Sequence, residues 1–155
     1  MASTLTAATM TVTLTESINL NGTNQGATNT LSLASIAEVS KRIVNVPASE
    51  VEVVAMSTAV ASGTFVESTV KYIRLTNLDD TNHITLTFKD EDNTEFAVLL
   101  DKGQSFIYNG DIAGGVVNTM HAGGSALTVS LNDLVNITAL ADTAACDMEI
   151  LVAST

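Results

Sequence analysis

Apolar and polar residues alternate along several stretches of this chain, and residues 10–20, MTVTLTESINL, show the pattern most clearly. The apolar residues of this stretch share one parity: Met10, Val12, Leu14, Ile18 and Leu20. Thr and Ser occupy the opposite parity at positions 11, 13, 15 and 17. A period of two is typical of a strand with one buried face. We therefore expect a half-buried strand here, with a Thr-rich outer face.

Strand-like alternation recurs down the chain, and turn-forming residues separate the stretches. Further strands are expected in residues 31–33, 44–46, 50–57, 65–77, 84–89, 96–100, 106–108, 127–139 and 146–154. Asn21 and Gly22 form a turn dipeptide, and NGTNQGATN, residues 21–29, is interpreted as a polar loop. One stretch is ambiguous, because Ile36, Val39 and Ile43 have a helix-like spacing that would also suit a short helix.

The pattern predicts an all-β protein of about eight to ten short strands. Turn signals come every 8–12 residues or so, and strands do not alternate with helices in a βαβ rhythm. That arrangement is typical of an antiparallel β-sandwich, here jelly-roll-like. A chain of 155 residues suits a single domain. We expect one sandwich domain over residues 1–155, with the uncharged, Thr-rich residues 1–9 as a candidate extended N-terminal arm.

Charged residues make up only 15% of the chain, against about 25% in an average soluble domain. The mean hydropathy is +0.32, yet no run of about 20 mostly apolar residues exists that could span a membrane. A weakly charged surface is one that protein copies bury against each other at little desolvation cost. We therefore expect a homo-oligomer, a dimer or trimer, although a solvated monomer is also compatible with the composition.

The net charge of −11 argues against nucleic-acid binding. All six Lys and Arg residues lie between positions 41 and 102, and they form no basic stripe for phosphates.

The single cysteine, Cys146, excludes an intrachain disulfide and implies no oxidising compartment. The first ten residues lack a basic leader and an apolar segment, so synthesis in a host cytoplasm is expected.

Two acidic turns are candidates for metal binding. NLDDTNH, residues 77–83, lies between two apolar alternating runs, and Asn, Asp and Thr are turn formers, so a hairpin turn is favoured over a metal site. DEDNTE, residues 90–95, offers the hard oxygen donors Asp90, Asp92 and Glu95. It lacks the Gly of an EF-type loop at its sixth position, so it is a weak Ca²⁺ candidate and is better explained as an exposed turn.

Catalytic signals are weak, and we expect neither an enzyme nor a cofactor. Ser105 in GQSFI lacks the second Gly of a nucleophile elbow, and His83 and His121 are the only histidines. Cys146 is flanked by acidic residues, which raise a thiol pKa rather than activate the thiol.

A carbohydrate-binding sandwich is an alternative, but the chain has no Trp, and Tyr72 and Tyr108 lie among apolar neighbours.

Residues 72–108, YIRLTNLDDTNHITLTFKDEDNTEFAVLLDKGQSFIY, resemble a module of tailed-phage virion proteins. That module runs strand, TN turn, strand, acidic turn, strand, Gly turn and aromatic strand. Residues 134–154, LVNITALADTAACDMEILVAS, resemble the closing strands of such proteins. The resemblance implies a non-enzymatic capsid decoration (cement) protein that binds the major capsid protein or another virion protein. A phage head-fibre or tail accessory protein is the near alternative.

Three regions are the expected contacts with other virion proteins: residues 4–9, residues 21–29 and the Gly-rich residues 111–124. Uncharged Thr-rich ends and exposed loops suit contacts made by surface shape, including strand addition to a neighbour. The interface candidates are Thr4, Leu5, Thr6, Asn21, Gly22, Asn24, Asp111, Gly114, Gly115, His121, Gly123 and Gly124.

Overall fold

The structure is a computed structural model that describes residues 5–109 and 133–155, without the side chain of Asn109. The chain divides into two units. The first is Met1–Glu38 together with Thr155, and the second is Val39–Ser154. In the described part of the chain, no helix is long and apolar enough to cross a membrane.

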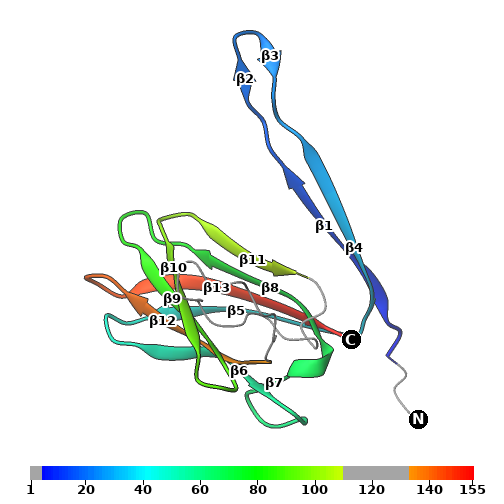
Figure 1. The fold of residues 1–155 in the computed structure, drawn as a ribbon, viewed down its shortest axis with the longest axis vertical. Coiled ribbons are helices and arrows are strands. Elements are labelled where there is room, and N and C mark those ends of the chain that lie inside the picture. The colour runs from blue at the N-terminus through cyan, green and yellow to red at the C-terminus, as the bar shows by residue number, and fades with distance from the viewer. Residues whose placement is uncertain (1–4, 110–132) are drawn as a thin grey trace, which may run out of the picture. The chain divides into compact units, whose positions relative to one another are not determined.

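The second unit is a β-sandwich of two sheets (Figure 1). One sheet has the order β10-β9-β12-β6-β7 and the other the order β11-β8-β13-β5. A short 3₁₀ helix, Glu67–Thr69, precedes β8. The strands are β5 (Glu38–Val46), β6 (Val51–Ser57), β7 (Phe65–Val66), β8 (Val70–Asn77), β9 (Ile84–Asp90), β10 (Glu95–Leu100), β11 (Ser105–Asn109), β12 (Leu134–Ala141) and β13 (Cys146–Ser154).

The strand order is that of a jelly roll. Strand β5 lies beside β13 and β6 beside β12, so strands from the two ends of the unit are neighbours. The chain passes from one sheet to the other at most connections, as it does in a jelly roll of two interlocked Greek keys. The long ladders β9–β10, β9–β12, β6–β12, β8–β11 and β8–β13 are antiparallel. The prediction of an all-β, jelly-roll-like antiparallel sandwich of about eight to ten strands is confirmed.

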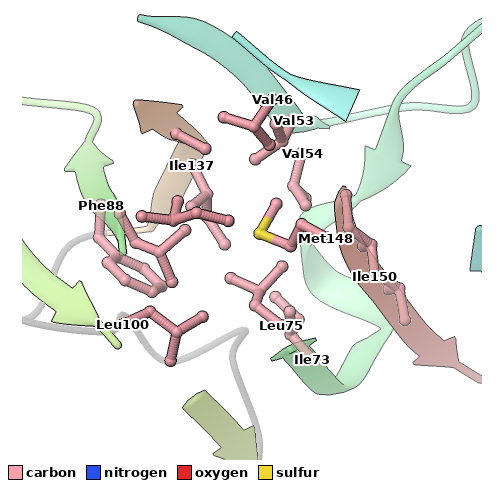
Figure 2. Close-up of a cluster of buried hydrophobic side chains, with 14 of the residues drawn as sticks. Val46, Val53, Val54, Ile73, Leu75, Phe88, Leu100, Ile137, Met148 and Ile150 are labelled. Carbon is pink, nitrogen blue, oxygen red and sulfur yellow. The ribbon is translucent and has the colours of Figure 1, made fainter. Parts of the chain in front are cut away.

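The alternation read from the sequence places apolar side chains between the two sheets. In β9, Ile84, Leu86 and Phe88 are buried, and the Thr residues between them lie on the outer face. Phe88 stacks on Phe96 of the neighbouring strand, with ring centroids 4.7 Å apart. Figure 2 shows side chains from both sheets, Met148 among them, pointing into this core. The burial of such side chains is the main force that holds the sandwich together.

The short helix considered for residues 36–43 is wrong. Residues 38–46 form strand β5 instead. Val39 and Ile43 share the outward parity of that strand and are 59% and 61% exposed, whereas Val46 points into the core. Residues four positions apart lie on the same face of a helix and also on the same face of a strand. The spacing of Val39 and Ile43 therefore could not distinguish the two.

The first unit is a long two-stranded ribbon made by β1 (Ala8–Thr15), β2 (Asn19–Leu20), β3 (Thr23–Asn24) and β4 (Thr28–Ile36) (Figure 1). Strand β1 pairs antiparallel with β4, and β2 with β3. Backbone hydrogen bonds from Glu16 to Ala27 and from Gln25 to Ile18 keep the same register between the two ladders. The four strands therefore form one continuous hairpin, which we call the ribbon.

The ribbon closes on the two-residue turn that the sequence indicated. Asn21 and Gly22 have φ angles of 51° and 80°. Positive φ at both central residues is what a type I′ turn requires, and Asn-Gly is its favoured pair because its twist matches that of the strands. The loop expected over residues 21–29 is wrong where β3 and the start of β4 occupy it, and residues 25–27 between them belong to no strand.

The strand predicted at residues 10–20 is present as β1 and β2, but it belongs to the ribbon and not to a sheet of the sandwich. The sandwich strands begin with β5, so the segment that precedes them is longer than the arm of residues 1–9 that the sequence indicated. The reason is physical: a period of two shows that one face of a strand is apolar, but not which surface covers that face.

Candidate functional site

The ribbon has two chemically different faces. Cross-strand pairing places Met10 opposite Leu33, Val12 opposite Leu31 and Leu14 opposite Asn29. We call Met10, Val12, Leu14, Leu31 and Leu33 the apolar ribbon face. The opposite side, the hydroxyl ribbon face, consists of Thr11, Thr13, Thr15, Thr28, Thr30 and Ser32, all of them exposed.

The apolar ribbon face is only partly covered. Leu14 is 51% exposed, and Met10, Val12, Leu31 and Leu33 are half-buried. Towards the turn, Glu16 interrupts the apolar row, and Ile18 and Leu20 then continue it at the parity of Leu14, with Leu20 58% exposed. A two-stranded hairpin is marginally stable by itself in water and gains stability when a third strand or another layer covers its apolar side. The ribbon therefore leaves apolar surface in contact with water along one side.

The ribbon is also almost uncharged. Glu16 is the one charged residue between positions 5 and 37. Residues 1–38 contribute −2 to the net charge of −11, from Glu16 and Glu38, so residues 39–155 carry −9. An uncharged surface loses less hydration free energy than a charged surface when a protein covers it.

The predicted interface residues that the structure describes lie at the two ends of the ribbon. Leu5, which is 71% exposed, and Thr6 precede β1. Asn21 and Gly22 form the closing turn, and Asn24 is the last residue of β3. The remaining candidates lie outside the described residues: Thr4, Asp111, Gly114, Gly115, His121, Gly123 and Gly124.

Sequence reasoning missed the apolar ribbon face itself. It proposed contacts before residue 10 and in the loop after residue 20, but it assigned the strand between them to the core. The signal was available in the two alternating runs on either side of an Asn-Gly turn, a pattern that predicts a hairpin. Pairing those runs around the turn would have placed Val12 opposite Leu31.

The outer face of the β11-β8-β13-β5 sheet carries an ion-pair ladder. Glu149 of β13 pairs with Lys41 of β5 at 2.9 Å and with Arg74 of β8. Hydrogen bonding from Lys41 and Arg74 lowers the pKa of Glu149 below its ordinary value, the Lys41 contact being the larger cause. Ion pairs at a protein surface contribute little to stability because solvent screens them, but these pairs keep this face charged.

The NLDDTNH stretch is a turn built on hydrogen bonds. An oxygen of Asp79 accepts the backbone N–H groups of Thr81 and Asn82, at 2.7 and 2.6 Å, and these two bonds hold the pKa of Asp79 below its ordinary value. The side chain of Asn77, at the end of β8, accepts the backbone N–H of Asp79 at 3.0 Å. The ring nitrogen Nδ1 of His83 lies 3.8 Å from the carboxylate oxygen Oδ2 of Asp142. This geometry confirms a turn, but the expected hairpin is wrong, because β8 and β9 lie in different sheets and do not pair with each other.

The DEDNTE stretch is also a turn. One oxygen of Asp90, Oδ1, accepts the backbone N–H groups of Asp92 and Thr94, at 3.1 and 2.7 Å. The carboxylate oxygen Oε2 of Glu95 lies 3.6 Å from the side-chain nitrogen Nζ of Lys89 on the neighbouring strand β9. Among residues 5–109 and 133–155, no group of three or more His, Cys, Asp or Glu side chains is arranged to hold a metal ion. The weak Ca²⁺ candidate at Asp90, Asp92 and Glu95 stays a prediction.

The residues considered for nucleophilic chemistry have other contacts. Ser105 shares a hydrogen bond with Thr76 at 2.8 Å. Cys146 is buried, and its thiol donates to the carbonyl oxygen of Ala144. Burial raises the pKa of the Cys146 thiol, and the nearby Asp79 carboxylate raises it further. A buried, protonated thiol is a poor nucleophile.

The two tyrosines do not form a platform for sugars. Tyr72 is 3% exposed, and Tyr108 packs against the core. Burial raises the pKa of both phenols. Sugar-binding sandwiches present ring faces to solvent, so these two rings offer no support for the carbohydrate-binding alternative.

Comparison with known proteins places the chain in no family. No protein-family model matches it, and no curated protein sequence does. It is similar to one chain from a structure entitled "Bacillus endospore appendages form a novel family of disulfide-linked pili", with 9% sequence identity and a TM-score of 0.45. The likeness covers 100% of this chain and 96% of the other. At this identity and score, the likeness establishes neither a family nor a function.

Proposed function

We propose that this protein is a non-enzymatic structural protein of a virion, a decoration protein that binds the outside of a phage head shell. The phage assignment comes from the resemblance of residues 72–108 and 134–154 to tailed-phage virion modules. The structural role has its own support in the ribbon, which carries the proposal. A long, nearly uncharged hairpin with a partly uncovered apolar face is suited to lie against another protein.

The division of the chain supports the same role. The jelly-roll unit packs large side chains between its two sheets, which suits a stiff body. Such a body tolerates mechanical load, while the ribbon offers an apolar face that a neighbour can cover. A cement protein needs both parts, because it must resist deformation of the shell and hold adjacent subunits together.

The decisive experiment uses the virus that encodes the chain. Particles from a deletion strain are purified, the recombinant full-length protein is added, and bound protein is measured after sedimentation. We expect saturable binding with a fixed number of copies per shell, and a higher temperature of genome release for decorated shells than for bare ones. Absence of binding to heads, with the protein found on tails or head fibres by immunogold labelling, would favour the accessory-protein alternative. Absence of the protein from purified particles would refute a virion role.

A further inference from the structure

We infer that the apolar ribbon face is covered by the same face of a second copy, so that two ribbons pack face to face as a pair of two-stranded layers. This contact goes beyond the proposed function, and it does not depend on whether the larger assembly is a virion. Two identical faces related by a two-fold axis make an isologous contact, the commonest kind in homo-oligomers.

The shape of the ribbon suits this pairing. From Ala8 to Leu20 the ribbon is roughly 40 Å long at the ordinary rise per residue of a strand. Large apolar side chains follow one another along both strands of the face, as the opposed pairs Met10–Leu33 and Val12–Leu31 show. Stacking two such faces produces the smallest sandwich with a dry interior, in which layers lie about 10 Å apart.

Charge favours a second ribbon over a sheet of the second copy's sandwich. Residues 39–155 carry a net charge of −9, so two sandwiches repel each other, whereas the side of the ribbon that bears the apolar ribbon face carries one charge, that of Glu16. The outer face of the β10-β9-β12-β6 sheet includes the Lys89–Glu95 pair and Glu52, which accepts a hydrogen bond from Asn136. Apolar side chains packed over those groups would remove their water and supply no hydrogen bonds in its place, which costs free energy.

The available area sets the strength of the contact. Complete burial of a Val, Leu or Met side chain removes roughly 60–120 Å² of apolar surface from water. The side chains of the face are already partly covered, so pairing would bury on the order of 250–400 Å² of apolar surface per copy. A standard specific interface buries about 800 Å² per partner. The free chain should therefore dimerise weakly, with a dissociation constant on the order of 100 µM, and pair more completely where copies are held side by side.

The first test is sedimentation of the full-length chain from about 5 to 1000 µM, with two matched double variants. V12D/L31D places two carboxylates on the apolar ribbon face, and T13D/T30D places two on the hydroxyl ribbon face at an equally opposed pair. We expect reversible dimers for the parent and for T13D/T30D, and dimerisation at least tenfold weaker for V12D/L31D. Raising the salt from 0.05 to 0.5 M should strengthen dimerisation of the parent, because salt screens the repulsion between sandwiches.

The second test does not depend on how the ribbon tolerates a carboxylate. Single Cys substitutions are made at Met10, Val12 and Leu14, and at Thr11 and Thr13 as controls, while the native Cys146 stays buried. Under mild oxidation, at least one apolar-face variant should form a disulfide-linked dimer faster than both controls.

Three results would overturn the inference. They are a parent chain that stays monomeric up to 1 mM, equal weakening by both double variants, and equal cross-linking from both faces. If the parent is monomeric and V12D/L31D loses binding to the shell while T13D/T30D keeps it, the shell protein is the occupant of the face. In that case the self-pairing inference fails and the proposed function stands.

Discussion

The substitution Asn77→Ala tests the best-defined polar group in the sandwich. Asn77 ends strand β8 and is completely buried. Its Nδ2 donates to the carbonyl oxygens of Leu100 at 3.2 Å and Asn82 at 2.9 Å, and its Oδ1 accepts the N–H of Asp79 at 3.0 Å. One side chain therefore ties the end of β10 to the turn that leads into β9. Alanine removes all three bonds at once and leaves their backbone partners in place.

The cost follows from where those partners lie. The bond to Leu100 is buried, and a buried acceptor that loses its donor costs about 1–3 kcal/mol. The bonds to Asn82 and Asp79 are part-buried, where water replaces some of the lost interaction, so each contributes about 0.5–1 kcal/mol. We expect Asn77→Ala to destabilise the sandwich by about 3 kcal/mol. For a chain of 155 residues, this corresponds to a fall in melting temperature of roughly 9 °C.

Urea unfolding followed by tyrosine fluorescence measures this loss in the sandwich alone. Both tyrosines, Tyr72 and Tyr108, lie in the sandwich, and the chain has no Trp, so unfolding of the ribbon does not contribute to the signal. Asn45→Ala is the matched control, because the Asn45 side chain makes one exposed hydrogen bond, to Asp147 at 2.9 Å. Its cost should stay below about 0.5 kcal/mol. The reasoning is refuted if the Asn77 variant unfolds within 0.5 kcal/mol of the parent, or no earlier than the control.

Three further predictions follow from titratable groups. Burial raises the pKa of Glu67, and the Asp133 and Glu91 carboxylates raise it further, so its charged form is disfavoured in the folded state. That penalty is present above the unfolded pKa and vanishes below it, so Glu67→Gln should raise the melting temperature at pH 7 and leave it unchanged at pH 3. The Cys146 thiol should react with a disulfide reagent at least tenfold more slowly in the native protein than in guanidinium, as absorbance of the released thiolate would show. Calcium at 5 mM should shift the melting temperature, read by calorimetry, by less than about 1 °C, because Asp90 is already engaged with backbone N–H groups.

The sandwich could be predicted from the sequence because its strands have one apolar face each. In β9 and β13, alternate residues such as Leu86 and Ile150 are buried, which is what a period of two indicates. Turn residues between these runs limited the strands to lengths typical of a jelly roll. The order of the strands within each sheet was not predictable, because alternation carries no information about which strand is the neighbour of which.

The burial of Asn77 was also beyond prediction from the pattern. It stands at the boundary between an apolar run and the polar stretch LDDTNH, where Asn is common in exposed turns. In the structure, its parity continues that of Ile73 and Leu75, so the backbone of β8 carries it into the interior. Three hydrogen bonds offset the cost of that burial. Only the geometry of the neighbouring turns supplies those partners.

The ribbon shows why a correct strand assignment left the candidate site unrecognised. Met10, Val12 and Leu14 would alternate in the same way whether a sandwich core or another molecule covered them. What separates the two cases is which residues form the core: among the described residues, the buried core cluster of the jelly roll comes from positions 46–152 and includes no residue of the apolar ribbon face. Apolar residues that a closed core does not use, placed on a nearly uncharged hairpin, have a favourable free energy of burial still available. In the proposed pairing of two ribbons, each copy would release that free energy by covering the apolar ribbon face of the other.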